Sequence, residues 1–387
     1  MAALTTLSAD VIAVFVAKGA RTFCYGFLGI VLPLYLAELG LGATGIGISV
    51  TAALAGSALL TWLIRRPAER YGARVALLAL VALSAVGAVL LLVTRQPWVV
   101  VVAAMLGNVA VGTGETGPFL TIEQVVVARA ATGTRRTTVL SLYNLLGYAA
   151  AALGSAMVGV IGSLTPLFLM FFAGAIVQAI AYLRIQTRPT AAPGAIVRPV
   201  SAPLIRKLAA LFALDSFAGG FVLQALVAYF LHTRFALSLE TLGAVFAGVQ
   251  VLTGVSMLLA AGAAARFGLL PTMVGSHLAS NVLLIAIAFA PTAGAAIAFL
   301  LARHLLSQMD VPTRQAYVMA VVADHEREAA ASLTNLSRTI AQAITPTLTG
   351  WVMQTIALSA PFVLGGVLKI AYDILLWQTF KDVKLRE

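Results

Sequence analysis

The stretch Arg65-Arg66-Pro67-Ala68-Glu69-Arg70-Tyr71-Gly72-Ala73-Arg74 is a short basic segment between two continuous apolar runs, Gly45 to Ile64 and Val75 to Val93. Each run has roughly the 20 apolar residues that an α-helix needs to cross a bilayer. A related segment, Ala265-Arg266-Phe267-Gly268, recurs about half the chain later between two further apolar runs. The stretch therefore predicts two membrane-spanning helices joined by a tight loop, in a design that the chain repeats.

The composition predicts a membrane protein along the whole chain. Of 387 residues, 61% are hydrophobic and 10% are Asp, Glu, Lys or Arg, whereas soluble domains carry about 25% charged residues. A water-soluble fold of this composition would expose large apolar patches. The apolar runs are continuous and lack strand-like alternation, which disfavours a transmembrane barrel. We therefore expect an all-α membrane protein without a separate soluble domain.

The apolar runs divide into two sets of six, which predicts twelve transmembrane helices in two pseudo-symmetric six-helix bundles. We expect residues 1–186 to form the N-terminal bundle, 187–203 a cytoplasmic linker containing Pro and Gly, and 204–387 the C-terminal bundle. The first six predicted spans are Val11 to Leu39, Gly45 to Ile64, Val75 to Val93, Trp98 to Val127, Thr137 to Ile161 and Pro166 to Ile185. The second six are Leu204 to Leu231, Leu242 to Ala265, Pro271 to Ala290, Ala293 to Val322, Ala329 to Ile356 and Pro361 to Phe380.

The net charge of +11 is unevenly placed. Most Lys and Arg residues between the spans fall on one side of the predicted membrane, whereas the other side has only Arg95 and Arg234. By the positive-inside rule, the linker and both termini face the cytoplasm. Arginines placed in this way hold the topology and contact lipid headgroups, so no nucleic-acid partner is expected. We expect a multi-pass protein of a bacterial-type inner (plasma) membrane.

The two halves also match at single positions inside the spans. A shift of about half the chain places Gly26 over Gly220, in the first and seventh spans. A shift one residue longer places Glu115 over Asp310, in the fourth and tenth spans. Matches at nearly equal shifts are typical of the internal repeats of membrane transporters.

Many ionisable residues lie inside the predicted spans. A charge at the bilayer centre costs about 3 kcal/mol, so together they would exceed a typical folding free energy of about 5 to 15 kcal/mol if they faced lipid. They must face one another or a watery cavity, and Arg21 and Asp215 fall near the midplane, where a solute site is expected. The residues are Lys18, Arg21, Glu115, Glu123, Asp215, Arg303, Asp310, Arg314, Arg338, Lys369 and Asp373.

With these features the chain resembles the major facilitator superfamily over essentially its whole length. The family's loop signature, Gly-x-x-x-Asp-Arg-x-Gly-Arg-Arg, is matched in part by residues 65–74, where Arg70, Gly72 and Arg74 fit and Glu69 replaces the aspartate. The resemblance implies a twelve-helix fold whose first, fourth, seventh and tenth helices line the central cavity. It also implies a gating role for Glu69, Arg70 and Gly72.

Three acids are candidates for proton coupling: Glu115, Asp310 and Asp215. A desolvated carboxyl group near an arginine changes its proton affinity as a cavity opens and closes. Glu115 and Asp310 could instead be static partners of nearby arginines, and Asp215 could be an ion-pair gate opposite Arg21.

The candidate substrate-binding residues are mostly arginines, because a guanidinium group binds carboxylate or phosphate through two parallel hydrogen bonds. The arginines could instead neutralise the buried acids, and the tyrosine and glutamine among the candidates could simply pack in the core. We expect Lys369 and Asp373, four residues apart on a peripheral helix, to form a local ion pair. The candidates are Arg21, Tyr25, Asp215, Gln224, Arg303, Arg314 and Arg338.

No metal ion or cofactor is predicted. The four histidines are scattered, and of these only His304 falls beside the predicted interior charges. None of the spacings is that of zinc ligands. The chain has no Gly-x-x-x-x-Gly-Lys loop for direct use of ATP, and no constellation of nucleophile and base, so an enzyme is not expected.

We therefore predict a monomeric secondary transporter that works by alternating access and exports a small organic or amphipathic solute in exchange for protons. Gly154 and Gly159 keep the outer glycines of the exporters' pattern Gly-Pro-x-x-Gly-Gly, which favours export slightly. One alternative is an uptake symporter or exchanger for an organic or inorganic anion, clamped by Arg21, Arg303 and Arg314. Another is a membrane receptor or scaffold that does not transport.

Overall fold

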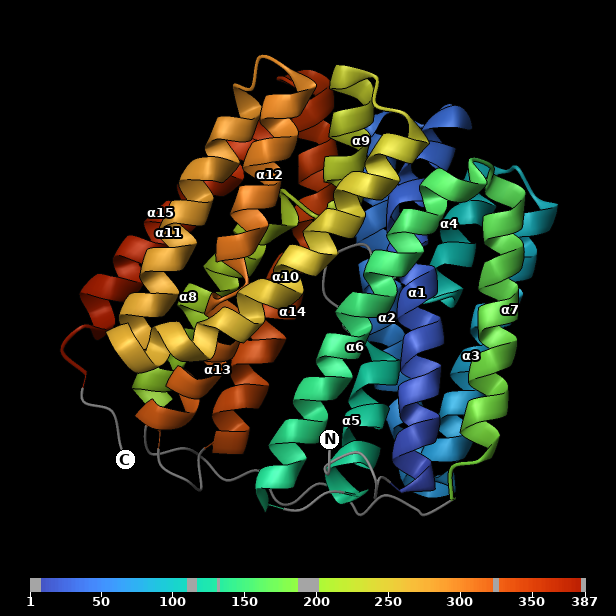
Figure 1. Cartoon of the computed structure of the whole chain (residues 1–387), viewed down its shortest axis with the longest axis horizontal. Coiled ribbons are helices and arrows are strands. Elements are labelled where there is room, and N and C mark those ends of the chain that lie inside the picture. The colour runs from blue at the N-terminus through green and yellow to red at the C-terminus, as the bar shows by residue number, and fades with distance from the viewer. Residues whose placement is uncertain (1–7, 110–116, 131–132, 187–201, 323–326, 384–387) are drawn as a thin grey trace. The chain divides into compact units, whose positions relative to one another are not determined.

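Helices form all the regular secondary structure in the residues that the computed structural model describes, which are 8–109, 117–130, 133–186, 202–322 and 327–383 (Figure 1). The first seven are α1 (Ala9–Glu38), α2 (Ala43–Tyr71), α3 (Ala73–Val93), α4 (Pro97–Leu106), α5 (Pro118–Ala130), α6 (Gly133–Ile161) and α7 (Leu164–Leu183). The others are α8 (Ala202–Gly220), α9 (Gln224–Phe235), α10 (Leu239–Phe267), α11 (Leu269–Ala288), α12 (Ala293–Ser307), α13 (Asp310–Val321), α14 (Arg327–Thr355) and α15 (Ala360–Phe380).

Nine helical segments in these ranges are long and apolar enough to cross a membrane, and one of them joins α8 and α9 as Pro203–Phe235. The other three predicted spans coincide with α4 and α5, with α12 and α13, and with α14. In α14, the polar residues Thr334, Arg338, Thr345 and Thr349 recur at helical spacing, which lowers the mean hydropathy. The prediction of an all-α membrane protein is confirmed.

Two corresponding spans are each divided into two shorter helices. The fourth span is interrupted between α4 and α5, where Asn108 has a φ of 48°. The tenth is interrupted at residues 308–309, between α12 and α13. Interrupted helices free backbone groups that must find partners or line a cavity, and they are typical of solute sites in secondary transporters.

The two loops that match in sequence also match in backbone geometry. Gly72 and Gly268 have φ values of 87° and 88°, a region that glycine adopts readily and other residues avoid. Each begins the next helix, α3 or α11. Arg70 and Arg266 each lie over the ring of the aromatic residue that follows them, 5.4 Å and 5.2 Å from its centroid. The sequence repeat is therefore a structural repeat.

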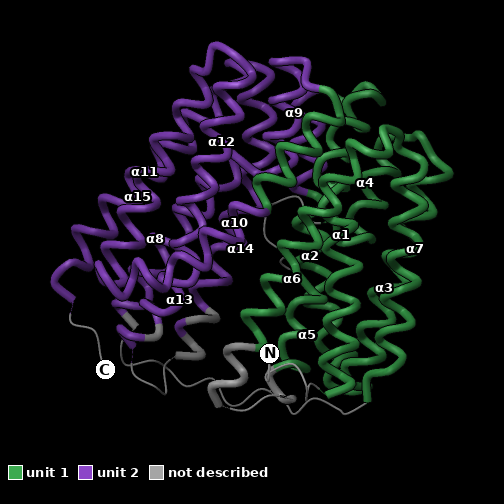
Figure 2. Tube along the Cα trace, viewed as in Figure 1, with its two compact units in different colours: residues 1–41, 52–193, 238–250 green, residues 42–51, 194–237, 251–387 purple. Residues whose placement is uncertain are grey.

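Contacts divide the chain into two units (Figure 2). Unit 1 comprises residues 1–41, 52–193 and 238–250, and unit 2 comprises residues 42–51, 194–237 and 251–387. Each unit thus includes the first residues of one helix, α10 or α2, whose remainder belongs to the other unit. The predicted bundle boundaries stay a prediction, because most of the linker lies outside the described residues.

In unit 1, α1 packs closely on α6 through small residues. The Ser155 hydroxyl donates to the Gly26 carbonyl at 3.1 Å. A Cβ on Gly26 would lie 2.9 Å from the Ser155 nitrogen and would collide with the Ala151 carbonyl, and one on Gly154 would collide with the Phe23 carbonyl. Small residues at such a crossing allow two membrane helices to touch along their backbones.

The same contact recurs in unit 2 between α8 and α14. The Thr349 hydroxyl donates to the Gly220 carbonyl at 3.4 Å, and a Cβ on Gly220 would press against the Thr345 side chain. Gly220 is the position that aligns with Gly26 in the sequence. The repeat therefore extends from the loops to the helix crossings.

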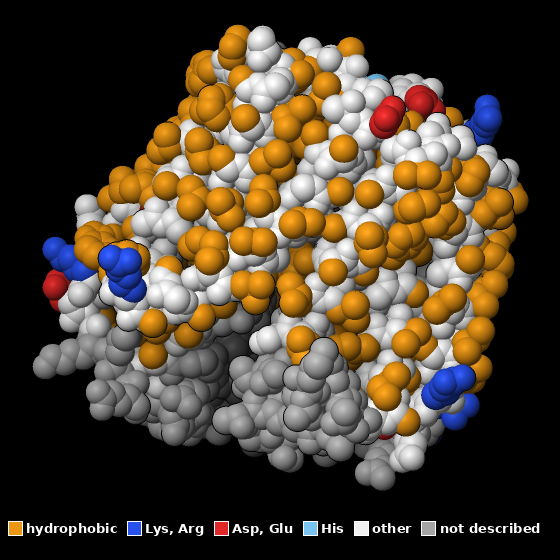
Figure 3. Space-filling model, in the orientation of Figure 1, with side chains coloured by type: hydrophobic (Ala, Val, Ile, Leu, Met, Phe, Trp, Pro, Cys, Tyr) orange, Lys and Arg blue, Asp and Glu red, His pale blue; other side chains and the backbone are white. Residues whose placement is uncertain are grey.

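Large apolar side chains remain exposed on the outer faces of the helices. Trp62 is 69% exposed, Val160 78% and Phe289 70%. Figure 3 shows hydrophobic side chains over most of the visible face, with few Lys, Arg, Asp or Glu side chains among them. Such exposure is costly in water and is suited to contact with lipid.

Candidate functional site

Unit 1 contains a buried ion pair between Arg21 of α1 and Glu123 of α5. Arg21 Nη1 donates to Glu123 Oε1 at 3.0 Å and Nη2 donates to Oε2 at 2.6 Å, which is a bidentate geometry. The hydroxyls of Tyr182 and Tyr143 donate to Oε1 and Oε2, each at 2.5 Å. Arg21 is 1% exposed and Glu123 0%, so the carboxylate is neutralised and hydrogen-bonded in the interior of unit 1.

Each cation of this ion-pair cluster lies over an aromatic ring. The Arg21 guanidinium lies 4.6 Å from the centroid of the Phe119 ring, on α5. Lys18, one turn before Arg21, lies 4.4 Å from the centroid of the Tyr143 ring, on α6. Ring faces attract cations and shield them from an apolar surrounding, so α1 can carry two positive charges inside unit 1.

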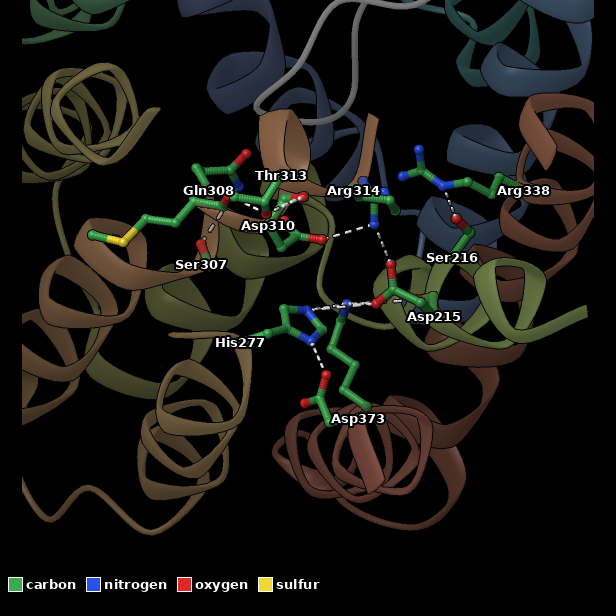
Figure 4. A network of polar contacts seen from close by, with 12 residues as sticks. Asp215, Ser216, His277, Ser307, Gln308, Asp310, Thr313, Arg314, Arg338 and Asp373 are labelled. Carbon is green, nitrogen blue, oxygen red and sulfur yellow. Dashed lines mark hydrogen bonds and ion pairs between the residues drawn. The ribbon is translucent and has the colours of Figure 1, made fainter. Parts of the chain in front are cut away.

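Asp215 of α8 is the centre of a larger network in unit 2 (Figure 4). Its Oδ2 accepts a hydrogen bond from Arg314 Nη1 at 3.1 Å, and its Oδ1 accepts one from Lys369 Nζ at 2.5 Å. The same Arg314 nitrogen donates to Asp310 Oδ2 at 2.7 Å. All of these side chains are buried. Asp215 is thus shared by two cations, and Arg314 by two carboxylates.

A second layer of the network joins α11 to α15. His277 Nδ1 lies 2.7 Å from Asp373 Oδ1, and Asn281 Nδ2 donates to Asp373 Oδ2 at 2.9 Å. His277 Nε2 lies 3.4 Å from Lys369 Nζ and 3.5 Å from Asp215 Oδ1. The imidazole therefore connects the Asp373 carboxylate to the Asp215 carboxylate (Figure 4).

Two arginines near this network have no carboxylate within ion-pair distance in the described part of the chain. Arg338 of α14 donates from Nε to the Ser216 hydroxyl at 2.9 Å. Arg303 of α12 is buried, and its Nε has no hydrogen-bond partner among the described residues. Both stand near the carboxylates and interact with them electrostatically. Their guanidinium groups are therefore suited to bind an anion.

The network also has oxygen and nitrogen atoms that a metal ion could use. Ligand atoms of Asp215, His277 and Asp310 lie within 4.8 Å of one another. However, Arg314 lies 2.7 Å from Asp310, and Lys369 lies 2.5 Å from Asp215. A divalent cation would have to displace these two cations or be repelled by them, so the donor set does not fit a metal centre.

The predicted gating residues lie at the junction of α2 and α3. Glu69 accepts a hydrogen bond from Arg65 Nε at 3.0 Å, within one turn of α2. Arg70 stacks on Tyr71, and Gly72 makes the turn. These contacts are local and exposed, and the gating role stays a prediction.

The other predicted site residues have varied positions. Tyr25 is buried in unit 1 and accepts a hydrogen bond from Asn108 Nδ2 at 3.4 Å, beside the interruption of the fourth span. Gln224 is buried at the first residue of α9. Glu115 lies outside the described residues, so its predicted coupling role stays a prediction.

A family model described as Major Facilitator Superfamily matches residues 14–301 of the chain. The chain belongs to the Major Facilitator Superfamily. As a member of it, the protein is a multi-pass secondary transporter that moves a small molecule across a lipid bilayer, and it is not an enzyme. The superfamily fold predicted from the sequence is thereby confirmed.

Other superfamily structures and one yeast protein are similar along nearly the whole chain. The uncharacterized membrane protein YJR124C of Saccharomyces cerevisiae is 22% identical, over 94% of this chain and 92% of its own length. The nucleoside transporter NupG has a TM-score of 0.75 at 14% identity, covering 96% of this chain and 99% of that chain. The D-xylose-proton symporter has a TM-score of 0.74 at 14% identity, covering 95% and 97%. At these identities the likeness to the two structures concerns the fold.

Two expectations about the superfamily member's charges are corrected by the structure. Lys369 and Asp373 do not pair with each other; Lys369 contacts Asp215 and Asp373 contacts His277. His277, not His304, is the histidine bonded to the interior acids, while His304 Nδ1 faces the Leu300 carbonyl at 2.8 Å. The expectation for Lys369 and Asp373 failed because each has a closer partner on another helix than the residue four positions away on its own helix.

Sequence reasoning also missed the tyrosines that bind Glu123. Tyr143 and Tyr182 lie in otherwise apolar spans, where a tyrosine most often packs in the core. The available signal was Glu123 itself, because a carboxylate inside a span requires donors on neighbouring helices.

Proposed function

We propose that this superfamily member is a proton-coupled symporter of a small organic anion. The observation that supports it is the excess of cations over acids among the described residues of the unit 2 network. The cations are Arg303, Arg314 and Lys369, which are buried, and Arg338, which is partly buried; the acids are the buried Asp215, Asp310 and Asp373. Because a net positive charge inside a membrane protein is costly, a bound anion would stabilise the network.

The shared contacts of Arg314 support symport in particular. Its Nη1 is bonded to both Asp310 and Asp215. A proton added to either carboxyl group would weaken its hold on the guanidinium and leave Arg314 available to a negatively charged solute. The proton and the anion then favour each other's binding, which is the linkage that symport needs.

Export, which was the first prediction from the sequence, is the second candidate here. It rests on Gly154 and Gly159 of α6, which keep part of the exporters' pattern. Both glycines pack closely on other backbones within unit 1, against Phe23 and Glu240 respectively. The direction of flux distinguishes the two candidates.

The test measures transport by the purified protein in liposomes whose external solution is more acidic than the solution inside. The panel contains organic carboxylates, sulfonates and phosphate esters, with neutral and cationic solutes of similar size. We expect an anion to accumulate inside together with protons. Arg338→Gln should raise its half-saturating concentration by roughly 10- to 100-fold, because it removes charge-assisted hydrogen bonds of about 1.5 to 3 kcal/mol.

Arg234→Gln is the matched control, because Arg234 is an exposed arginine of α9 that binds the Ala288 and Ala290 carbonyls. It should transport like the native chain. Asp310→Asn and Glu115→Gln test the coupling acids, and loss of proton flux with retained solute exchange would support them. Accumulation of a cation or a neutral solute would contradict the proposal that the substrate is an anion. Net efflux of solute driven by inward proton movement would show that the protein is an exporter and not a symporter.

A further inference from the structure

His277 is a buried imidazole with charged groups at both ring nitrogens. Nδ1 lies 2.7 Å from Asp373 Oδ1. Nε2 lies 3.4 Å from the Lys369 ammonium and 3.5 Å from Asp215 Oδ1. Imidazole is the one side chain that ordinarily changes its charge between about pH 5 and 8. A proton added to this ring would therefore change the charge of the network.

The neighbours of His277 determine which ring nitrogen carries the proton in the neutral state. The Asp373 carboxylate accepts hydrogen bonds, so Nδ1 is the donor to it. Asn281 Nδ2 donates to the other oxygen of Asp373 at 2.9 Å and lies 3.2 Å from His277 Nδ1, so Asn281 holds both groups in place. Nε2 is then left with its lone pair toward the Lys369 ammonium, which can donate to it.

A proton added at Nε2 would change these contacts. The nitrogen would become a donor, so it could no longer accept from Lys369, and an imidazolium would stand beside an ammonium. The nearest acceptor for the new N–H is Asp215 Oδ1 at 3.5 Å, which Lys369 already occupies at 2.5 Å. His277 would therefore compete with Lys369 and Arg314 for the carboxylate of Asp215.

We propose that His277 is a proton-binding residue of the transport cycle, and that Asp373 and Asn281 are the residues that position it. This proposal rests on the proposed function, because it adds a proton site to the network that would hold the anion. Protonation of His277 withdraws Asp215 from its other cations and raises the positive charge beside Arg314. An anion then binds more strongly to the protonated state.

The helices around α11 carry charged groups, and several of these groups lie close to the imidazole. α15 contributes Asp373 and Lys369, with the ring of Tyr372 at a centroid distance of 5.8 Å. α13 contributes Asp310, an oxygen of which lies within 4.8 Å of the ring nitrogen, and Arg314 beyond it. α8 contributes Asp215, and α12, which also packs on α11, carries the buried Arg303 and His304. Asp373, Asp215 and Asp310 favour the imidazolium, and Lys369 and Arg314 oppose it.

The experiment is ¹⁵N NMR of histidine side chains in the full-length native protein in lipid nanodiscs between pH 5 and 8. The His277 signals are assigned by their loss in His277→Gln, or by a chain in which His277 is the one histidine left. We expect a neutral ring protonated at Nδ1 at high pH and an imidazolium at low pH. Asp373→Asn should lower the proton affinity of His277 by about tenfold or more, and Lys369→Met should raise it.

The opposite signs of the two substitutions separate proton binding from a structural role. A residue that only packs would show no change of protonation state in either variant. If Asp373→Asn does not fold, Lys369→Met still decides the matter, because a rise in the imidazolium fraction at a given pH supports the proposal and no change contradicts it. His232→Gln is the control, since His232 is exposed on α9 and bonded to the Leu237 carbonyl; it should leave the His277 signals unchanged.

The NMR measurement needs no transported solute, so its result can contradict this proposal without contradicting the proposed function. Proton-driven flux in liposomes with a His277 that stays neutral down to pH 5 would overturn this proposal and leave the proposed function standing. A titrating His277 in a protein that shows no proton-driven flux would overturn the proposed function and, with it, the role of His277 in coupling.

Discussion

Glu123 and Asp215 are both buried carboxylates, but their surroundings differ in kind. Glu123 accepts two hydrogen bonds from one guanidinium and one from each of two tyrosines. The Arg21 guanidinium balances the negative charge of Glu123, and the other two partners of Glu123 are neutral tyrosine hydroxyls. Asp215 is contacted by Arg314 and Lys369, which bring more positive charge than it can balance. The first arrangement stabilises a fold, and the second is sensitive to any added proton or ion.

Replacing Glu123 should therefore act mainly on stability. Glu123→Gln removes the carboxylate that balances Arg21, and breaking one partner of a buried ion pair costs about 3 to 5 kcal/mol. Tyr143→Phe removes one hydrogen bond at the same carboxylate and should cost about 1 kcal/mol. Thermal unfolding of the purified protein in detergent measures both. Equal losses for the two variants would show that Glu123 is not neutralising Arg21.

At this scale the sequence predicted which groups are buried but not which groups pair. The cost of a charge in lipid placed Arg21, Asp215, Asp310 and Arg314 in the interior, and the structure has all four there. Pairing depended on side chains far apart in the chain: Arg21 and Glu123 are 102 residues apart, and Asp215 and Lys369 are 154 apart. No local spacing encodes such contacts.

Among the helices, the α1–α6 crossing depends on the absence of side chains at a few positions. Gly26 and Gly19 lie on the same helix, α1. A Cβ at Gly26 would collide with α6, whereas one at Gly19 would meet nothing within 4 Å. The two glycines therefore form a matched pair for testing close helix packing.

Gly26→Ala should destabilise unit 1, because the two backbones must separate to admit the methyl group. Gly19→Ala should leave stability unchanged or raise it by up to about 1 kcal/mol, because alanine has the higher helix propensity. The two variants are compared by their unfolding temperature in one detergent. A Gly26→Ala protein as stable as Gly19→Ala would mean that the crossing tolerates a wider spacing.

The sequence repeat predicted features of these elements correctly because the same loop and the same helix crossing occur once in each half of the chain. Gly72 and Gly268 share a positive φ, and the hydroxyls that bond to the Gly26 and Gly220 carbonyls stand at corresponding places on α6 and α14. The interruption of the tenth span was not predicted, because the apolar pattern of a span does not show where its helix breaks.

For the molecule as a whole, the predicted orientation can be tested with introduced cysteines. Cys24 is the one cysteine of the chain and is 1% exposed, so the native protein is a low-background control. Arg66→Cys lies at the end of α2, and Arg95→Cys lies between α3 and α4; both positions are exposed. A membrane-impermeant maleimide added outside intact cells should label Arg95→Cys but not Arg66→Cys. The reverse labelling pattern would place the termini outside.

The sequence by itself determined the class of the molecule: an all-helical membrane protein with two related halves and charges kept away from lipid. It could do so because hydrocarbon forces each spanning segment to satisfy its own backbone hydrogen bonds, and that requirement is visible in the length and charge of every apolar run. Only the tertiary structure decided that Asp215 is held by Arg314, Lys369 and His277, and that Glu123 is held by Arg21 and two tyrosines. Those choices depend on which faces of separate helices meet, and the partner of a charge is set by distance in space rather than by position along the chain.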